Sequence, residues 1–241
     1  MKKALIVGGA NGIGLAIALQ LNDYDSVYII DKVAPDMTGL PAHICFEQFD
    51  LTSLDYSIFD RYQDVSLLMI TAGFGRLAHF SDISEQHIID SFQVNAVAAI
   101  RIVKHFYQRL QSADDFLCGI MVSIAGFMSS PLFAVYGATK AALKIFIESV
   151  NVELEMGGSS NRILNVSPGS IKGTNFNGSG NDLNLTTELA RQIIGHLEAK
   201  DDLFIPQYEE VYCEVLRRYH DDFRAEGRHS YEYKLRSGRM K

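Results

Sequence analysis

The fold is decided by eight residues near the N-terminus, VGGANGIG at positions 7–14. They follow a short apolar run, Ala4–Val7, and lead into a second one, Leu15–Leu21. Glycines in such a turn let the backbone bend tightly and let a phosphate group approach, and the helix that follows offers free N–H groups at its positive end. A glycine pattern alone fits a structural turn equally well, but the flanking strand and helix favour a dinucleotide-binding loop.

Outward from this loop, short apolar segments alternate with longer helical stretches. Several short segments are apolar on both faces, as strands of a buried parallel sheet are. One helical face carries apolar residues at spacings of three and four between Ile89 and Leu110. This alternation predicts an α/β fold, a doubly wound parallel sheet in three layers with right-handed crossovers. The predicted strands are Ala4–Val7, Val27–Ile30, Ile44–Phe46, Ser66–Ile70, Gly119–Val122, Ile163–Val166 and Leu203–Ile205.

Two aspartates follow predicted strands. Asp31 ends the second strand, where a carboxylate accepts hydrogen bonds from the ribose hydroxyls of NAD and repels the 2′-phosphate of NADP. Lys32 opposes this preference for NAD, because its positive charge partly neutralises the repulsion of the 2′-phosphate. Alternatively, Asp31 is simply a solvent-exposed aspartate at the end of a strand. Asp50 follows the third strand, where it either reaches an adenine amino group or caps a turn.

Three residues downstream suggest acid–base chemistry. Tyr136 and Lys140 are four apart in a predicted helix and share one face, and Ser123 ends a strand upstream. A free tyrosine has a pKa near 10 and is a poor base at neutral pH. A nearby ammonium group lowers that pKa, and a serine hydroxyl holds the substrate oxygen beside the phenol. A solvated lysine beside a half-buried tyrosine is the ordinary alternative, which Ser123 and the glycine loop disfavour.

Together these motifs resemble the short-chain dehydrogenase/reductases over roughly Lys2 to Pro206. The resemblance implies a Rossmann fold and an oxidoreductase acting on CH–OH groups, which transfers a hydride between NAD(H) and an alcohol or carbonyl substrate. The matching residues are Gly8-Gly9-Ala10-Asn11-Gly12-Ile13-Gly14, Asp50-Leu51, Thr71-Ala72-Gly73, Asn95, Ser123, Tyr136-Gly137-Ala138-Thr139-Lys140 and Pro168-Gly169.

The resemblance also implies roles for single residues. It makes Tyr136 the acid/base and has Asn95 hold a water in a proton relay to Lys140, whereas Asn95 alone is simply a polar residue inside a helix. The implied catalytic tetrad is Asn95, Ser123, Tyr136 and Lys140. The cofactor, NAD(H) in preference to NADP(H), is expected to contact Gly8, Asn11, Gly12, Ile13, Gly14, Asp31, Asp50, Leu51, Ala72, Gly73, Tyr136, Lys140, Pro168, Gly169, Ile171 and Thr174. No metal is expected.

The chain departs from the family pattern at three places. Val7 stands where the family usually has threonine, which removes a structural hydrogen bond but leaves the phosphate loop. Thr71 replaces the usual asparagine of the fourth-strand motif. One extra residue follows Pro168-Gly169, in the sequence SIKGT at 170–174, so the contact between Thr174 and the cofactor depends on how the loop accommodates it.

Composition narrows the class of protein. The 241 residues are enough for one large α/β domain, and a net charge of −7 does not favour nucleic acid or an anionic membrane as a partner. Three irregularly spaced cysteines predict neither a disulfide framework nor a metal site and fit a reducing cytoplasm. Without a targeting segment or a membrane span, we expect a cytoplasmic protein with small-molecule substrates.

Segments around the predicted site are rich in apolar residues, so the substrate pocket is expected to be mainly apolar. Arg76 and Lys172 are the candidates for binding a substrate carboxylate. The predicted pocket residues are Phe74, Phe127, Met128, Leu132, Phe133 and Phe176. Three alternatives stay open: an NADP(H)-dependent carbonyl reductase of the same fold, a redox-silent nucleotide-binding regulatory protein, and a methyltransferase, which would not need the serine, tyrosine and lysine.

The chain continues beyond the seventh strand. We assign residues 1–206 to the NAD(P)-binding Rossmann domain and residues 207–241 to a C-terminal helix and basic tail of the same domain. An apolar stripe from Tyr208 to Phe223 predicts a helix packed on an apolar surface. After Gly227 the chain is either a frayed terminus or a segment that docks on a partner subunit through Tyr231, Tyr233 and Leu235.

Self-association is also expected. The helix through Phe92, Val103 and Phe106, and the helix after Tyr136, are more apolar than one sheet face requires. Relatives pair these two helices across a two-fold axis, so we expect a homodimer or homotetramer.

Overall fold

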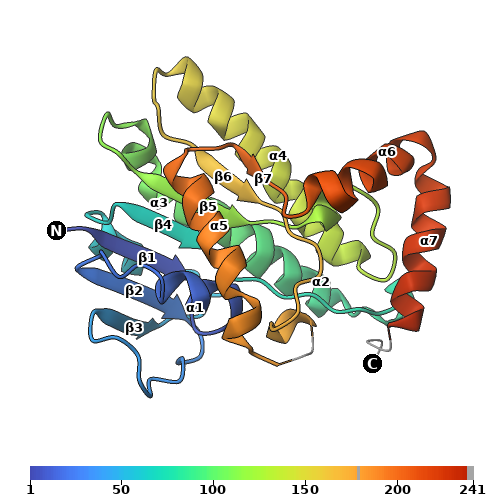
Figure 1. The fold of residues 1–241 in the computed structure, drawn as a ribbon, viewed down its shortest axis with the longest axis horizontal. Coiled ribbons are helices and arrows are strands. Elements are labelled where there is room, and N and C mark those ends of the chain that lie inside the picture. Colours follow the sequence, from blue (N-terminus) through green and yellow to red (C-terminus); the bar gives the residue numbers. More distant parts are fainter. Residues whose placement is uncertain (178–179, 238–241) are drawn as a thin grey trace.

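The computed structural model describes residues 1–177 and 180–237. Its centre is one parallel sheet in the order β3-β2-β1-β4-β5-β6-β7 (Figure 1). The observed strands lie within two residues of the predicted ones at each end, and the predicted fold class is confirmed. The strands are β1 Lys3–Val7, β2 Ser26–Asp31, β3 Ile44–Gln48, β4 Leu67–Ile70, β5 Leu117–Met121, β6 Ile163–Val166 and β7 Leu203–Phe204.

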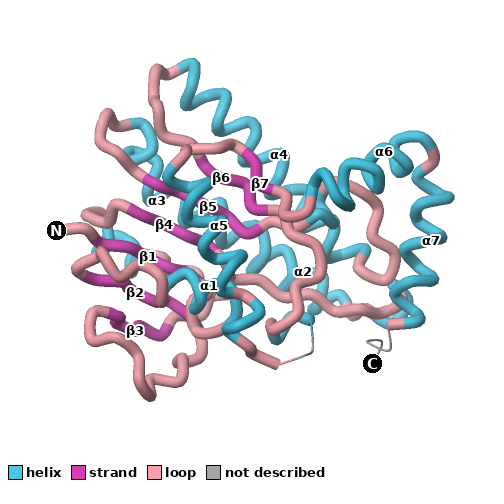
Figure 2. The backbone as a smooth tube through the Cα atoms, in the orientation of Figure 1, coloured by secondary structure: helices cyan, strands magenta, loops and turns pink. Residues whose placement is uncertain are grey.

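Helices cover both faces of the sheet and make three layers (Figure 2). On one face lie α1 (Gly12–Ala18) and α5 (Thr187–Glu198). On the other lie α3 (Ala98–Gln111) and α4 (Ala134–Met156). The helix α2 (Glu85–Phe92) joins α3 through one π-helical turn, Gln93–Val97.

The strand β1 shows how the sequence builds two cores. Successive side chains of a strand point to opposite faces. Ala4 and Ile6 therefore enter the core under α1 and α5, while Leu5 and Val7 enter the core under α3 and α4. All four are at most 1% exposed, because both faces of the sheet are covered.

The order of the strands fixes where a ligand can bind. The chain winds outward in one direction through β2 and β3 and in the other from β4 onward, so the order reverses between β1 and β4. Ligands of doubly wound sheets bind in the crevice at such a switch point, beyond the carboxyl ends of the strands. The glycine turn after β1 and the segment after β4 meet there, since Thr71 N and Ala72 N both donate to Val7 O.

Residues 207–237 form a C-terminal arm outside the sheet layers (Figure 1). The predicted single helix is instead a π-turn, Tyr208–Tyr212, followed by α6 (Cys213–Asp221) and α7 (Phe223–Arg236). Asp222 separates the two helices and caps α7 by accepting from Arg224 N and Ala225 N. The prediction of a frayed terminus after Gly227 is wrong as far as Arg236, because α7 continues to that residue. Residues 238–241 lie outside the described residues.

The predicted apolar packing of this arm is confirmed only in part, since Tyr212, Val215, Leu216 and Tyr219 are half-buried. Tyr208, Val211 and Phe223 remain 40 to 50% exposed. In the described part of the arm, the buried residues are Glu226, Gly227 and Lys234. Polar contacts help to hold the arm to the rest of the molecule, since Lys234 Nζ donates to Ser130 Oγ and Pro131 O. Within residues 1–177 and 180–237, no helix is long and apolar enough to cross a membrane.

Candidate active site

A cleft of about 1450 Å³ opens at the carboxyl ends of the strands. Pockets for one small ligand are roughly 300–1,000 Å³, so this cleft has room for two molecules side by side. Every predicted site residue except Asn95 lines it. These residues are Gly8, Asn11, Gly12, Ile13, Gly14, Asp31, Asp50, Leu51, Ala72, Gly73, Ser123, Tyr136, Lys140, Pro168, Gly169, Ile171 and Thr174.

The glycine turn after β1 lies directly against the end of β4. Gly8 has a φ of +88°, and a β-carbon placed on it would lie 2.3 Å from Ala72 N. A β-carbon on Gly14 would lie 2.4 Å from Thr71 Oγ1. Only glycine fits at either place, so the backbone itself forms the wall of the cleft. Such a wall suits a pyrophosphate, which must approach main-chain N–H groups closely.

Thr71, which stands where the family usually has asparagine, connects the end of β4 to the glycine turn. Its hydroxyl donates to Val7 O over 3.2 Å and to Gly8 O over 2.9 Å. It thereby ties the end of β4 to the glycine turn, although Val7 has no hydroxyl of its own. Gly12 N donates to Asn181 Oδ1 over 2.7 Å, which brings the chain before α5 against the same turn.

The far end of the cleft carries the two predicted aspartates. Asp31 Oδ2 accepts from Ala10 N over 3.1 Å, so the glycine turn fixes the carboxylate at the end of β2. Lys32 lines the cleft beside it. Asp50 Oδ1 accepts from Thr52 N and Thr52 Oγ1, which fits the turn-capping alternative, while the residue also faces the cleft. These hydrogen bonds lower the pKa of Asp50 and keep it ionised.

Tyr136 and Ser123 meet at the opposite end. Burial raises the pKa of the Tyr136 phenol to about 12, and a hydrogen bond with Ser123 offsets part of that rise. The expected lowering of this pKa by an ammonium neighbour does not occur in the structure. Tyr136 is therefore a protonated phenol at neutral pH, and its hydroxyl is a proton donor.

Lys140 is the most deeply buried charged group of the site, with 2% exposure. Burial lowers the pKa of its amine from 10.5 to about 7, because the charged form loses its hydration. Its Nζ donates to Met121 O over 2.8 Å and lies 5.7 Å from the centre of the Tyr136 ring. A half-neutral amine at this distance explains why it does not pull down the phenol pKa.

Asn95 lies behind the cleft wall, in the π-helical turn between α2 and α3. Single π-turns inside helices are frequent at functional sites. The Asn95 amide donates to Phe74 O and Thr139 Oγ1 and accepts from Phe74 N. A β-carbon placed on Gly73 would lie 3.3 Å from Asn95 Oδ1 and 3.4 Å from Lys140 Nζ. Asn95 and Lys140 therefore converge on Gly73.

The loop after β6 absorbs its extra residue at a glycine. Gly173 adopts a left-handed φ of +76°, which an L-residue other than glycine rarely adopts. This turn brings Thr174 back into the cleft, where a β-carbon on Gly12 would lie 3.6 Å from Thr174 Cγ2. The contact between Ser123 and this loop is direct, since Ser123 Oγ donates to Pro168 O over 3.4 Å.

An aromatic cluster forms one wall beside Tyr136. The rings of Phe133 and Phe176 are centred 5.4 and 5.0 Å from the ring of Tyr136. Phe74 and Met128 also line the cleft, whereas Phe127 and Leu132 do not. The predicted apolar wall is thus formed by four of the six predicted residues. Arg76 and Lys172 do not line the cleft.

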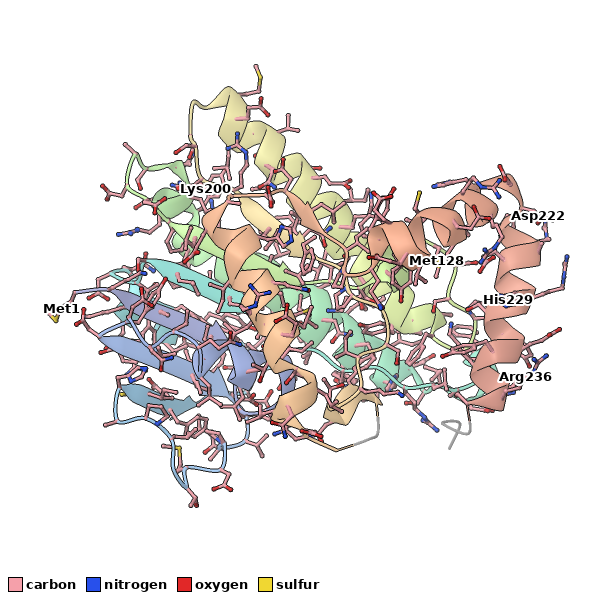
Figure 3. The ribbon with its side chains drawn as sticks, viewed as in Figure 1. Met1, Met128, Lys200, Asp222, His229 and Arg236 are labelled. Carbon is pink, nitrogen blue, oxygen red and sulfur yellow. The ribbon has the colours of Figure 1, made fainter. Side chains whose placement is uncertain are left out.

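A further wall of the cleft was not predicted. It is formed by the C-terminal arm, whose helix α7 packs against the segment that carries Met128, since Lys234 Nζ donates to Ser130 Oγ and Pro131 O (Figure 3). Most of its cleft-lining residues are polar: Tyr212, Glu226, His229, Ser230, Tyr233 and Lys234. The sequence shows the helical spacing of Tyr208, Tyr212 and Val215, but this spacing predicts a packing surface and not the wall of a cleft.

Comparison with known proteins identifies the family to which the chain is similar. The family model for short chain dehydrogenase matches residues 2–184. Among curated proteins, the uncharacterized oxidoreductase TDA5 of Saccharomyces cerevisiae is 27% identical over 184 residues, 72% of this chain and 56% of the relative. The very-long-chain 3-oxoacyl-CoA reductase of Phaeosphaeria nodorum is 26% identical over 177 residues, 64% of this chain and 51% of the relative. The chain thus spans little more than half the length of these two relatives.

Solved structures share the fold over nearly the whole chain. A short-chain dehydrogenase of Burkholderia cenocepacia, solved in complex with NADP, has a TM-score of 0.78 and 19% identity over 95% of this chain and 99% of its own. One from Streptomyces avermitilis has a TM-score of 0.76 and 20% identity, over 98% of this chain and 99% of its own. From the matched family model and this shared fold, we conclude that the chain belongs to the short-chain dehydrogenase family.

Proposed function

We propose that this chain is a nicotinamide-dependent oxidoreductase that interconverts an alcohol and a carbonyl compound, with Tyr136 as the acid/base. The observation that carries the proposal is the convergence of a protonated, buried phenol, a serine hydroxyl and a buried lysine amine at one end of a glycine-walled cleft. Bound along that cleft, the cofactor would supply the hydride for reduction of a carbonyl or accept it from an alcohol.

The chain's own residues supply the proton. With a pKa of about 12, Tyr136 holds its proton until the substrate oxygen gains negative charge, and then donates it. The Ser123 hydroxyl hydrogen-bonds the same oxygen and keeps it beside the phenol. When Lys140 is charged it stabilises the phenolate that remains, and Asn95, beside it at Gly73, orders the route by which the proton returns.

The cofactor would lie with its pyrophosphate on the glycine turn and its adenosine ribose near Asp31. We propose NAD(H) as the preferred form, since Asp31 is held in place by Ala10 N and would repel a 2′-phosphate. Lys32 on the same wall makes NADP(H) the alternative. The remaining cofactor contacts are proposed at the predicted residues that line the cleft, including Leu51, Gly73 and Ile171.

We also propose a homodimer or homotetramer in solution. On α4, Ile145, Val152 and Met156 are 58 to 83% exposed. A row of exposed apolar side chains on a long helix is what a symmetric helix–helix interface buries. A small-molecule substrate and a cytoplasmic setting complete the proposal.

The test is Tyr136→Phe, assayed with a panel of ketones, aldehydes and alcohols in the presence of NADH, NADPH and their oxidised forms. The variant keeps the ring and removes the proton donor, so turnover should fall about 10²- to 10⁴-fold while cofactor still binds. Tyr107→Phe, on α3 outside the cleft, is the matched control and should leave turnover unchanged. Full activity in Tyr136→Phe would refute the assigned role.

The redox-silent alternative has its own signature in this experiment. A wild-type chain that binds NADH or NADPH but turns over no member of a broad panel would favour a nucleotide-binding regulatory protein.

A further inference from the structure

The C-terminal arm brings one more hydroxyl group to the reaction end of the cleft. Tyr212 lies in the π-turn that opens the arm, and its side chain reaches Gly169. A β-carbon placed on Gly169 would lie only 1.7 Å from Tyr212 Oη. The phenol therefore occupies the space that any larger residue at position 169 would fill.

The surroundings of this hydroxyl suit a ligand. Tyr212 is half-buried and lines the cleft, and burial, with a smaller effect from Tyr233, raises the pKa of its phenol. Within residues 1–177 and 180–237, no group hydrogen-bonds Tyr212 Oη. The hydroxyl opens on the cleft, where a bound molecule can donate a hydrogen bond to it or accept one from it.

The position of Gly169 places this hydroxyl next to the proposed reaction centre. The preceding residue, Pro168, accepts a hydrogen bond from Ser123 Oγ over 3.4 Å, and Ser123 in turn hydrogen-bonds Tyr136. Neighbouring Cα atoms are about 3.8 Å apart. Three hydroxyls, from Tyr136, Ser123 and Tyr212, therefore gather around one dipeptide of the loop after β6.

The wall beyond Tyr212 is also rich in hydrogen-bonding groups. On α7, Glu226, Ser230 and Tyr233 follow at spacings of four and three, so they share one face, and all three line the cleft. The charge of Glu226 is already paired, since its carboxylate accepts from Arg218 Nε over 2.7 Å. This wall therefore offers both hydrogen-bond donors and acceptors to a hydroxylated substrate.

We propose that Tyr212 is a substrate-binding residue that hydrogen-bonds a second oxygen, on the carbon next to the reacting carbonyl. The substrates are then α-hydroxy carbonyl compounds in reduction and vicinal diols in oxidation. In reduction, a bound reduced nicotinamide would supply the hydride to the carbonyl carbon, and Tyr136 would donate its proton to the carbonyl oxygen. The neighbouring hydroxyl stays intact, bound to Tyr212. This inference rests on the proposed oxidoreductase function.

The experiment compares two ketones that differ in one hydroxyl, 2-hydroxycyclohexanone and cyclohexanone, with wild type and Tyr212→Phe. The measured quantity is the ratio of their kcat/KM values, since intrinsic reactivity and any general loss of activity cancel between variants. One hydrogen bond between uncharged groups is worth roughly 5- to 10-fold. The ratio should fall by that factor in Tyr212→Phe and stay unchanged in Tyr219→Phe, a control on α6 outside the cleft.

The wild-type chain gives a second measurement that needs no variant. trans-Cyclohexane-1,2-diol should be oxidised with a kcat/KM at least 5-fold above that of cyclohexanol. An unchanged ratio in Tyr212→Phe, or equal use of diol and mono-alcohol by the wild type, overturns the role of Tyr212. If Tyr136→Phe abolishes turnover in the same preparations, the proposed function survives that result. Absence of turnover with every substrate in the wild type instead removes the proposed function itself.

Discussion

Replacing Lys140 by methionine should change how the stability of the fold depends on pH. Methionine has a similar length and no charge, so it fills the same space between α4 and β5. The wild-type amine is 2% exposed, and its pKa falls from 10.5 to about 7 on burial. Between these two values the unfolded chain binds a proton that the folded chain lacks. The stability of the wild type therefore rises with pH across that window.

The magnitude follows from the two pKa values. A pKa shift is worth about 1.4 kcal/mol for each unit, and integrating the linkage relation between pH 6 and pH 9 gives about 2–3 kcal/mol. Over that range the unfolding free energy of the wild type, relative to Lys140→Met, should increase by this amount. The neutral amine can still donate to Met121 O, so the variant lacks this hydrogen bond over the whole pH range.

Urea unfolding at pH 6, 7, 8 and 9, followed by circular dichroism, measures the difference directly. Stopping at pH 9 keeps Tyr136 protonated in both states, since its pKa rises from 10 to about 12 on folding. Lys144→Met, on the same helix and ion-paired with Glu148 at the surface, is the control and should show no such slope. A wild-type minus Lys140→Met difference that stays constant from pH 6 to 9 would show that the amine titrates normally, and the burial argument would be wrong.

Three further predictions follow from the cleft and its edges. Asp31→Ser should change the ratio of the NADH and NADPH dissociation constants by roughly 10-fold in favour of NADPH, as measured by fluorescence titration. An unchanged ratio would mean that another residue sets the cofactor preference. Gly8→Ala places a β-carbon 2.3 Å from Ala72 N at a φ of +88°, so the free energy of unfolding should fall by more than about 2 kcal/mol in thermal unfolding. A Tm equal to that of the wild type would contradict this geometry. Lys234→Met removes donors to Ser130 Oγ and Pro131 O, so hydrogen exchange in α7 should accelerate while that in α3 stays constant; equal protection of α7 in both proteins would mean that other contacts hold the arm.

The main architecture was predictable because each local signal agreed with the next. The run at Ala4–Val7 is apolar on both faces, as a buried parallel strand is, and the glycine turn marks where this first strand ends. The predicted site followed from local position: Ser123 lies just after β5, at the carboxyl edge of the sheet, and Tyr136 and Lys140 lie four residues apart on one face of α4.

Other features depended on tertiary structure that a sequence pattern does not carry. The π-turn around Asn95 has no distinctive sequence, and the pKa of Tyr136 depends on how completely Phe133 and Phe176 exclude water. The stripe containing Tyr212 has helical periodicity, but periodicity does not reveal whether the apolar face meets a core or a cleft. The helix beyond Gly227 was missed because its few aliphatic residues predict no core, and it is fixed instead by Lys234 and Glu226.

The polar attachment of the C-terminal arm separates substrate specificity from folding stability, two properties that often constrain each other in proteins. Substitutions at Ser230 and Tyr233, on the cleft-facing side of α7, should leave both cores of the sheet intact, since neither core contains a residue of α7. Glu226 and Lys234 are excluded, because their contacts hold the arm. Evolution, or an engineer, can therefore exchange the residues that face the substrate without first finding compensating changes in the core. The arm is a place where specificity can diverge rapidly on a scaffold whose folding is maintained independently.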